Sequence, residues 1–429
     1  MLREGQQLYH YKEDTMNFNP FAEKPLVSDN FYDWKQLSVK PYNKFQIDPT
    51  TRLRIILANG AEYEAVWFSH RFNRHCDNND IRRQIALSRR QEQQQQKRIA
   101  ALKPTNEDLL EHTIGYEQLA VELTAIFAQR ETDSYVKQAM NFALIEDFDH
   151  LYRYANLLDM DQGVKVEDLV GNYTEVMPAR PTISEHRYPT DEIKRFVNFH
   201  KCDQLTVLDS SILVCAEQQT MNYYMNQAAF YHNNLGKQLF SEIAMIEEQH
   251  VSMYGSLLDV NGSWLEKLLL HEYAECYMYY SLWQDEQDKH VKKIFEEHFN
   301  TELLHLHQAA EMLEKYEKKE WRQIISNGNF PELLKFGTSS NIDYVRKIIS
   351  EEAAITENRE EYSEVSQLPD DSMFFQYQEQ VNHNVKNVAS HNVIDKRIAD
   401  EGEDWRLQRQ MHPLEPMRDR THDNTQVGR

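Results

Sequence analysis

Residues 216–259 read AEQQTMNYYMNQAAFYHNNLGKQLFSEIAMIEEQHVSMYGSLLD and carry the pattern that decides the fold. Glu217 is followed after 30 residues by Glu247, and His250 stands three residues further on. The same pattern recurs without a gap in two further blocks of 44 residues, 116–159 and 271–314. The coinciding residues are Glu117, Asp147 and His150 in the first block, and Glu272, Glu302 and His305 in the last. A repeat in constant register indicates three copies of one structural unit.

The acid that stands 30 residues upstream makes this repeat more significant than its acid-x-x-His pairs alone. With 69 acidic residues and 18 histidines among 429 residues, roughly three acid-x-x-His pairs are expected by chance. The chain has four, ending at His150, His250, His305 and His422. An acid stands 30 residues before the acid of each of the first three pairs, whereas none stands at that position before the pair that ends at His422. The shared spacing, and not the short motif, therefore carries the hypothesis.

Each block is expected to form two antiparallel helices joined by a short turn. In the central block Glu217 lies about 16 residues before the turn near Asn233, and His250 lies about 14 residues after that turn. At a rise of about 1.5 Å per residue, both return to a similar height. Glu247 and His250 are three residues apart and share a helix face. The sequence thus predicts an all-α bundle in which these side chains meet at one level.

The level of the predicted bundle at which these side chains meet is apolar, and this favours a metal site. Side chains such as Leu213, Ile243 and Met253 follow the same stripes as the acids and the histidine. Buried carboxylates are costly unless they are paired or bind a metal. Carboxylate and imidazole ligands suit Fe, Mn or Zn, and the pattern contains no thiolate. The alternative is that these residues form surface ion pairs or are histidines satisfied within the core.

The composition narrows the class of protein. The net charge of −22 disfavours nucleic acid and anionic membranes as partners. The four cysteines, Cys76, Cys202, Cys215 and Cys276, form no Cys-x-x-Cys pair and predict reduced thiols in a cytoplasmic protein. We expect no signal peptide and no membrane span, because no suitable apolar run is present.

The flanking regions predict three parts of the chain. Residues 1–104 are expected to form an extended arm, a β-hairpin over 53–68 around Asn59-Gly60, and a basic helix over 79–103. Residues 105–327 are expected to form the metal-binding helical domain. Residues 328–429 are expected to hold one helix near 341–358 and a polar, weakly patterned tail.

The repeated Glu…Glu-x-x-His pattern resembles that of the ferritin-like di-metal carboxylate superfamily, which includes bacterioferritin, rubrerythrin, manganese catalase and the ribonucleotide reductase small subunit. The resemblance covers residues 105–325 at most. It implies a four-helix bundle in which two Glu helices and two Glu-x-x-His helices hold two Fe or Mn ions. Glu247 and Glu302, or Asp147, would then bridge the metals.

The chain departs from this family in three ways. It has three predicted hairpins where the bundle needs two, it carries Asp147 where a Glu is expected (with Glu146 as an alternative), and it lacks a rubredoxin module. The long connection over 160–216 favours pairing of the first two hairpins. The complete Glu/Glu/His sets favour the last two, and all three could surround one axis. Glu275, three residues after Glu272, competes with it but does not fit the register.

The pattern favours an oxidoreductase that binds two or more Fe or Mn ions and acts with dioxygen or peroxide. Tyr224, Tyr254 and Tyr279 lie near the ligands and could relay electrons, although core packing is the ordinary role of buried tyrosines. Two alternatives stay open: an iron-binding ferroxidase or storage protein, and a non-catalytic helical scaffold. The sequence also leaves open an organic substrate and self-association.

Overall fold

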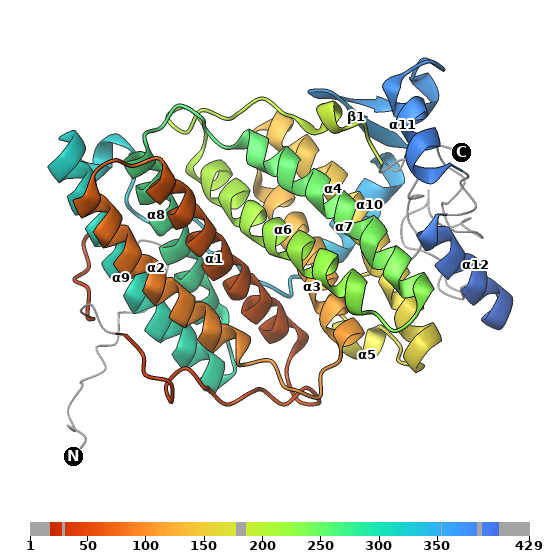
Figure 1. Cartoon of the computed structure of the whole chain (residues 1–429), viewed down its shortest axis with the longest axis horizontal. Helices are drawn as coiled ribbons and strands as arrows, with labels where there is room; N and C mark the ends of the chain where they lie inside the picture. Colours follow the sequence, from red (N-terminus) through yellow and green to blue (C-terminus); the bar gives the residue numbers. More distant parts are fainter. Residues whose placement is uncertain (1–17, 28–30, 177–185, 353, 384–387, 403–429) are drawn as a thin grey trace.

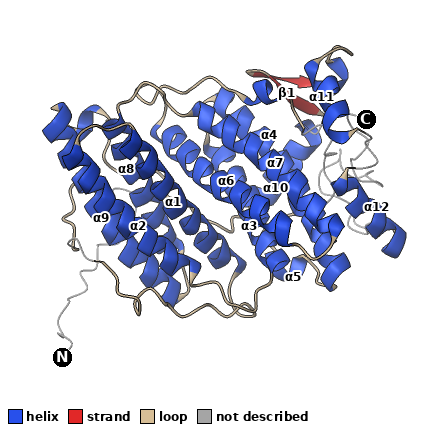
Figure 2. Ribbon diagram, in the orientation of Figure 1, coloured by secondary structure: helices blue, strands red, loops and turns tan. Residues whose placement is uncertain are grey.

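The computed structural model describes residues 18–27, 31–176, 186–352, 354–383 and 388–402, and these are mostly helical (Figures 1 and 2). The long helices are α1 (Pro49–Arg74), α2 (Asn79–Ala100), α3 (Leu109–Arg130), α4 (Ser134–Gln162), α6 (Gln204–Phe230), α7 (Asn234–Leu257), α8 (Trp264–Asp285) and α9 (Lys289–Glu317). Among the described helices, none combines the length and the apolar composition needed to cross a membrane.

The eight long helices form four antiparallel hairpins: α1–α2, α3–α4, α6–α7 and α8–α9. Helices α3, α4, α6 and α7 make one four-helix bundle, here called the α3 bundle. Helices α1, α2, α8 and α9 make a second one, the α1 bundle, which lies beside the first (Figure 1). The first and last hairpins of the chain therefore share one bundle and enclose the middle two in sequence.

Short polar caps set the turns between the helices. Asp133, Asn233 and Asp288 accept hydrogen bonds from backbone N–H groups in the first turns of α4, α7 and α9. Ser263 begins α8 with a capping box that also uses Glu266. Such caps satisfy N–H groups that have no partner within the helix, so each polar turn starts a new helix at a fixed residue.

The predicted β-hairpin over 53–68 is wrong, because α1 covers this whole segment. Asn59-Gly60 marks a close contact between helices and not a turn. A Cβ added at Gly60 would lie 2.6 Å from the side chain of Gln219 and 3.0 Å from the carbonyl oxygen of Cys215. Helix α1 packs against α3, α6 and α8 and is buried around most of its surface, so its sequence lacks a clear apolar stripe. Residues 49–100 thus supply half of a bundle.

The basic helix expected over 79–103 corresponds to α2, and the helix expected near 341–358 corresponds to α10 (Ser340–Glu352). Strands β1 (Ile355–Asn358) and β2 (Glu361–Glu364) pair antiparallel, with Asn358 opposite Glu361. The expected polar tail contains α11 (Met373–Asn382) and α12 (Ala389–Glu401), and α12 packs against α4 and α7. Its last part, 403–429, lies outside the described residues. The short elements are α5 (Glu167–Val170), η2 (Pro189–Glu192), η3 (Trp321–Gln323) and η4 (Val365–Gln367).

Candidate metal centres

The α3 bundle brings six of the predicted ligands together in its core, and we call this group the two-histidine cluster. Its members are Glu117 on α3, Asp147 and His150 on α4, Glu217 on α6, and Glu247 and His250 on α7. All six side chains are at most 1% exposed. The structure therefore joins the first two predicted hairpins. It does not pair the last two, and it does not place all three around one axis.

The ligand atoms of the two-histidine cluster define two adjacent positions. At the first, Nδ1 of His150 lies 3.0 Å from Oε1 of Glu247 and 4.0 Å from Oε2 of Glu117. At the second, Nδ1 of His250 lies 3.4 Å from Oε2 of Glu247. The two oxygens of Glu247 thus face different histidines, as a bridging carboxylate would.

Two further acids complete the second position. Nδ1 of His250 lies 3.3 Å from Oδ1 of Asp147 and 3.5 Å from Oε2 of Glu217. In each of the two groups, one ligand atom per residue can be chosen so that all lie within 4.8 Å of one another. Asp147, despite its shorter side chain, therefore reaches the site.

The α1 bundle holds a second cluster with the same arrangement, which we call the one-histidine cluster. Its members are Glu62 on α1, Glu92 and Gln95 on α2, Glu272 on α8, and Glu302 and His305 on α9. Glu62, Glu92 and Gln95 follow the same spacing of 30 and then three residues as the other hairpins. They went unrecognised because the motif required a histidine where Gln95 stands. A search for the spacing alone would have found them.

The distances in the one-histidine cluster match those of its counterpart. Nδ1 of His305 lies 2.7 Å from Oε1 of Glu92, 3.1 Å from Oε2 of Glu302 and 3.8 Å from Oε2 of Glu272. Oε1 of Glu302 accepts a hydrogen bond from Nε2 of Gln95, which also donates to Glu62 at 3.1 Å. Glu302 therefore spans two positions as Glu247 does.

Neighbouring side chains orient the ligands of both clusters. Tyr224 donates a hydrogen bond of 2.6 Å to Glu117, and Tyr279, at the equivalent position of α8, donates one to Glu62. Such partners fix the direction in which a ligand presents its free oxygen. Two of the three tyrosines noted in the sequence thus have a defined hydrogen-bonding role.

The far nitrogens of two ligand histidines also have partners. Nε2 of His250 lies 2.7 Å from Oε2 of Glu146, and Nε2 of His305 lies 3.1 Å from Oε1 of Gln91. In both histidines Nδ1 is left to face the carboxylates. Glu146, considered as an alternative to Asp147, lies on the outer side of His250 and pairs with the guanidinium of Arg187.

Burial dominates the electrostatics of the two clusters. It raises the pKa of Glu117 well above its usual value, and repulsion from Glu247 adds to this effect. Burial and then repulsion from Glu92 raise the pKa of Glu62 in the same way. The pKa of Asp147 is also raised well above its ordinary range, by burial and then by Glu217. These shifts arise because carboxylates have been gathered out of water without sufficient cationic partners.

The clusters also contain buried carboxylate oxygens that accept no hydrogen bond from any described residue. These are Oε2 of Glu117, Glu217 and Glu247 and Oδ1 of Asp147 in one cluster, and Oε2 of Glu62, Glu92 and Glu272 in the other. Leaving such groups unsatisfied costs about 1–3 kcal/mol each. Oxygen and imidazole donors grouped in this way fit a divalent cation such as Fe²⁺ or Mn²⁺.

Two buried arginines lie around the two-histidine cluster. Arg153 on α4 lies 3.1 Å from Glu242 and 3.2 Å from Asp149, and Arg187 pairs with Glu146 and with Glu357 of β1. Burial lowers the pKa of His150 well below its usual value, and the charge of Arg153 adds to this effect. The region after α9 thus contributes to the surroundings of this cluster.

Comparison with protein-family models, with curated proteins and with solved structures finds no match to this chain. Its function must therefore be argued from the geometry of the two clusters.

Proposed function

We propose that each bundle binds a pair of Fe or Mn ions and that the protein is an oxidoreductase of the ferritin-like di-metal carboxylate type, acting with dioxygen or peroxide. One observation carries this proposal: an equivalent arrangement of buried ligand residues is assembled twice, each time with a carboxylate whose two oxygens face two separate positions. Buried ion-pair networks alone do not require this duplication.

The roles of the residues follow from their positions. Glu247 would bridge the two ions of the α3 bundle, while His150 and His250 each bind one through Nδ1. Glu117 and Glu217 would complete the two coordination shells from the facing helices. The bound ions would supply the electron transfer, and the protein would keep the site dry and its ligands oriented.

The protein loaded with Fe²⁺ under anaerobic conditions should consume dioxygen or peroxide when either is added, as measured with an oxygen electrode and by peroxide titration. The variant Glu247→Ala/His250→Ala should lose the part of this activity that depends on the α3 bundle. Glu248→Ala is the matched control, since it changes the adjacent acid outside the cluster.

The results of this experiment distinguish an enzyme, a ferroxidase or storage protein, and a helical scaffold. Sustained turnover of peroxide or of an added reductant supports an enzyme, whereas a single oxidation of the loaded iron supports a ferroxidase or storage protein. Wild-type protein that binds neither Fe²⁺ nor Mn²⁺ would overturn the proposal and leave the helical scaffold.

A further inference from the structure

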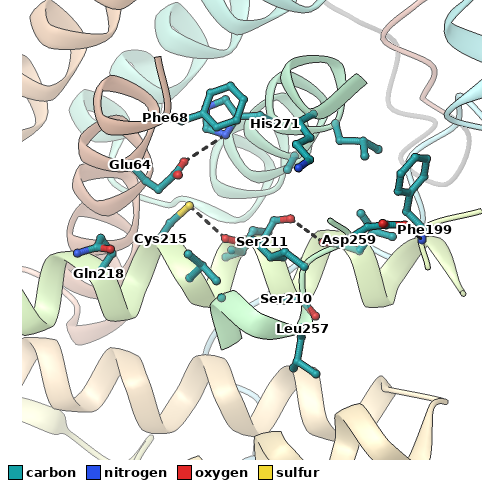
Figure 3. A pocket seen from close by; sticks show the side chains of 18 of the residues that line it. Glu64, Phe68, Phe199, Ser210, Ser211, Cys215, Gln218, Leu257, Asp259 and His271 are labelled. Carbon is teal, nitrogen blue, oxygen red and sulfur yellow. Dashed lines mark hydrogen bonds and ion pairs between the residues drawn. The ribbon is translucent and has the colours of Figure 1, made fainter. Parts of the chain in front are cut away.

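A cavity of about 380 Å³ lies between the two bundles, outside both metal clusters. Figure 3 shows part of its lining. Its wall is formed by α1, α6, α7 and α8 together with the segment that precedes α6. Most of the lining is apolar or aromatic, including Phe68, Phe199 and Trp264. A cavity of this size and composition is typical of a site for a small organic molecule.

Three polar side chains face one another on the α1 and α8 side of this cavity. His271 on α8 lies between two carboxylates, with Nδ1 3.3 Å from Glu64 and Nε2 3.4 Å from Glu275. Phe68 stacks on the ring of His271 at 4.9 Å and holds it in place. Figure 3 shows Glu64 and His271 pointing toward each other at the cavity wall.

Glu275 links the cavity to the one-histidine cluster. It lies one helical turn after the ligand Glu272 on α8, and it interacts electrostatically with Glu92 and Glu302. Glu275 is 3% exposed, and neither of its oxygens accepts a hydrogen bond from the described residues. Apart from Nε2 of His271 at 3.4 Å, the described residues bring no donor to this buried acid, and a ligand with a donor group could satisfy it.

We propose that this cavity binds a largely apolar organic molecule that ends in a hydrogen-bond-donating group, an amine or an alcohol, with that group directed at Glu275. The apolar body lies against the aromatic wall, and the polar end lies beside the one-histidine cluster. A ligand that ends in a carboxylate is disfavoured there, because its charge would be buried beside two acidic side chains, Glu64 and Glu275. That the ligand is a substrate of the adjacent metal centre rests on the proposed function, whereas its binding does not.

The test uses the tryptophans that line the cavity, Trp67 and Trp264, as reporters. The probes are octylamine, octan-1-ol and octanoate, and each is titrated against the full chain while its tryptophan fluorescence is recorded. We expect saturable binding of the amine and the alcohol, with octanoate binding at least about tenfold more weakly, which corresponds to about 1.4 kcal/mol. Octanoate that binds as tightly as the amine would overturn the proposal.

Gly255 offers a matched pair of variants. It lines the cavity, and a Cβ added to it would meet no atom within 4 Å. Gly255→Phe should fill part of the cavity and weaken binding of all three probes, while Gly255→Ala should bind them as the wild type does. Equal binding by Gly255→Phe and Gly255→Ala would contradict this site. Ala274→Phe on α8 provides a second way to fill the cavity from its inner wall.

Glu275→Gln tests the polar contact without changing the shape of the side chain. It should reduce the preference for octylamine over octanoate by about tenfold, since the amide keeps an acceptor oxygen but cannot become the anion that pairs with an ammonium group. An unchanged preference would exclude Glu275 as the contact. The titrations are run on protein loaded with redox-inert Zn²⁺ and on metal-free protein. Binding in either form, without any dioxygen consumption by the iron-loaded protein, would remove the substrate role and leave the binding site.

Discussion

In the α3 bundle two histidines lie opposite each other across a shared glutamate, whereas in the α1 bundle Gln95 stands where His150 stands in the other. The remaining ligands occupy equivalent positions, and the only other change among them is Asp147 in the α3 bundle against Glu92 in the α1 bundle. A neutral amide oxygen is a weaker donor to Fe²⁺ or Mn²⁺ than an imidazole nitrogen. The two bundles should therefore bind the same kind of metal pair with different affinity.

The side chains that surround the two clusters also differ. The two-histidine cluster is enclosed by Arg153 and Arg187 and their acidic partners. The one-histidine cluster instead has Glu275 and the cavity beside it. The α3 bundle thus resembles a closed centre, and the α1 bundle a centre that an organic molecule can approach. The same arrangement of helices thus carries two clusters with different surroundings.

The largest effect is expected from removing the ligands of one bundle at a time. Glu247→Ala/His250→Ala should abolish metal binding by the α3 bundle, and Glu302→Ala/His305→Ala should abolish it in the α1 bundle. Elemental analysis after reconstitution should then give about half of the wild-type metal content for each variant, and almost none for the two combined. Loss of all metal from either single-bundle variant would show that the bundles are not independent sites.

The protein without metal should become less stable as the pH rises from about 5.5 to about 8. A carboxyl whose pKa is higher in the folded than in the unfolded chain stabilises the fold fully below the unfolded value, and this contribution is lost as the pH rises through the folded value. The pKa of Glu62 and of Glu117 is raised well above the reference value of 4.5. Chelated protein should therefore have a lower free energy of unfolding at pH 8 than at pH 5.5. The loss is about 1.4 kcal/mol for every pH unit over which one such carboxyl is protonated in the folded chain and ionised in the unfolded chain.

Neutral replacements of these acids provide the comparison between bundles. Glu117→Gln and Glu62→Gln should each stabilise the metal-free protein at pH 8 and have a smaller effect at pH 5.5, as measured by urea denaturation. The lowered pKa of His150 acts in the opposite direction, since a neutral histidine favours the fold as the pH rises. Metal-free protein that gains stability toward pH 8 would show that the histidine contribution is the larger one.

Exchanging His and Gln between positions 150 and 95 should make the metal affinities of the two clusters more alike. Gln95→His should strengthen metal binding in the α1 bundle, and His150→Gln should weaken it in the α3 bundle, each by at least about tenfold, since partners of ligands alone change affinity by 10–100-fold. Competition with a coloured chelator measures both affinities. Gln95→Ala is the control that removes the amide without adding a donor. Equal affinity of wild-type and Gln95→His protein in the α1 bundle would mean that residue 95 does not reach the metal.

Helix geometry explains how much of the site could be predicted from the sequence. The equal spacing fixes the height of Glu217, Glu247 and His250 on antiparallel helices, and the structure places all nine predicted ligands at two such levels. The spacing alone left three pairings of the hairpins open, and only the long connection over 160–216 favoured the one that the structure forms. The contribution of α1 was missed because the helix lies between the two bundles and has no clear apolar stripe.

The fourth hairpin illustrates a limit of motif searches. Glu92-x-x-Gln95 preserves the spacing and the position of the other pairs but not the residue type. Glu275 illustrates the opposite case, because the register places it outside the predicted ligand set, while only the structure places it in a cavity wall. Spacing identifies what lies at one level of a bundle, and packing between bundles determines what lies around it.

The smallest effects are expected from the tyrosines that contact the ligands. Tyr224→Phe should lower the metal affinity of the α3 bundle by about tenfold or less and leave the α1 bundle unchanged, because its hydroxyl donates only to Glu117 within the clusters. Tyr279→Phe should do the reverse through Glu62, with a larger effect, since His298 also lies 3.2 Å from the Tyr279 hydroxyl and would lose this neighbour. Chelator competition on both variants tests the asymmetry. Equal losses in both bundles from either variant would indicate that the clusters are coupled through the α1, α3, α6 and α8 interface.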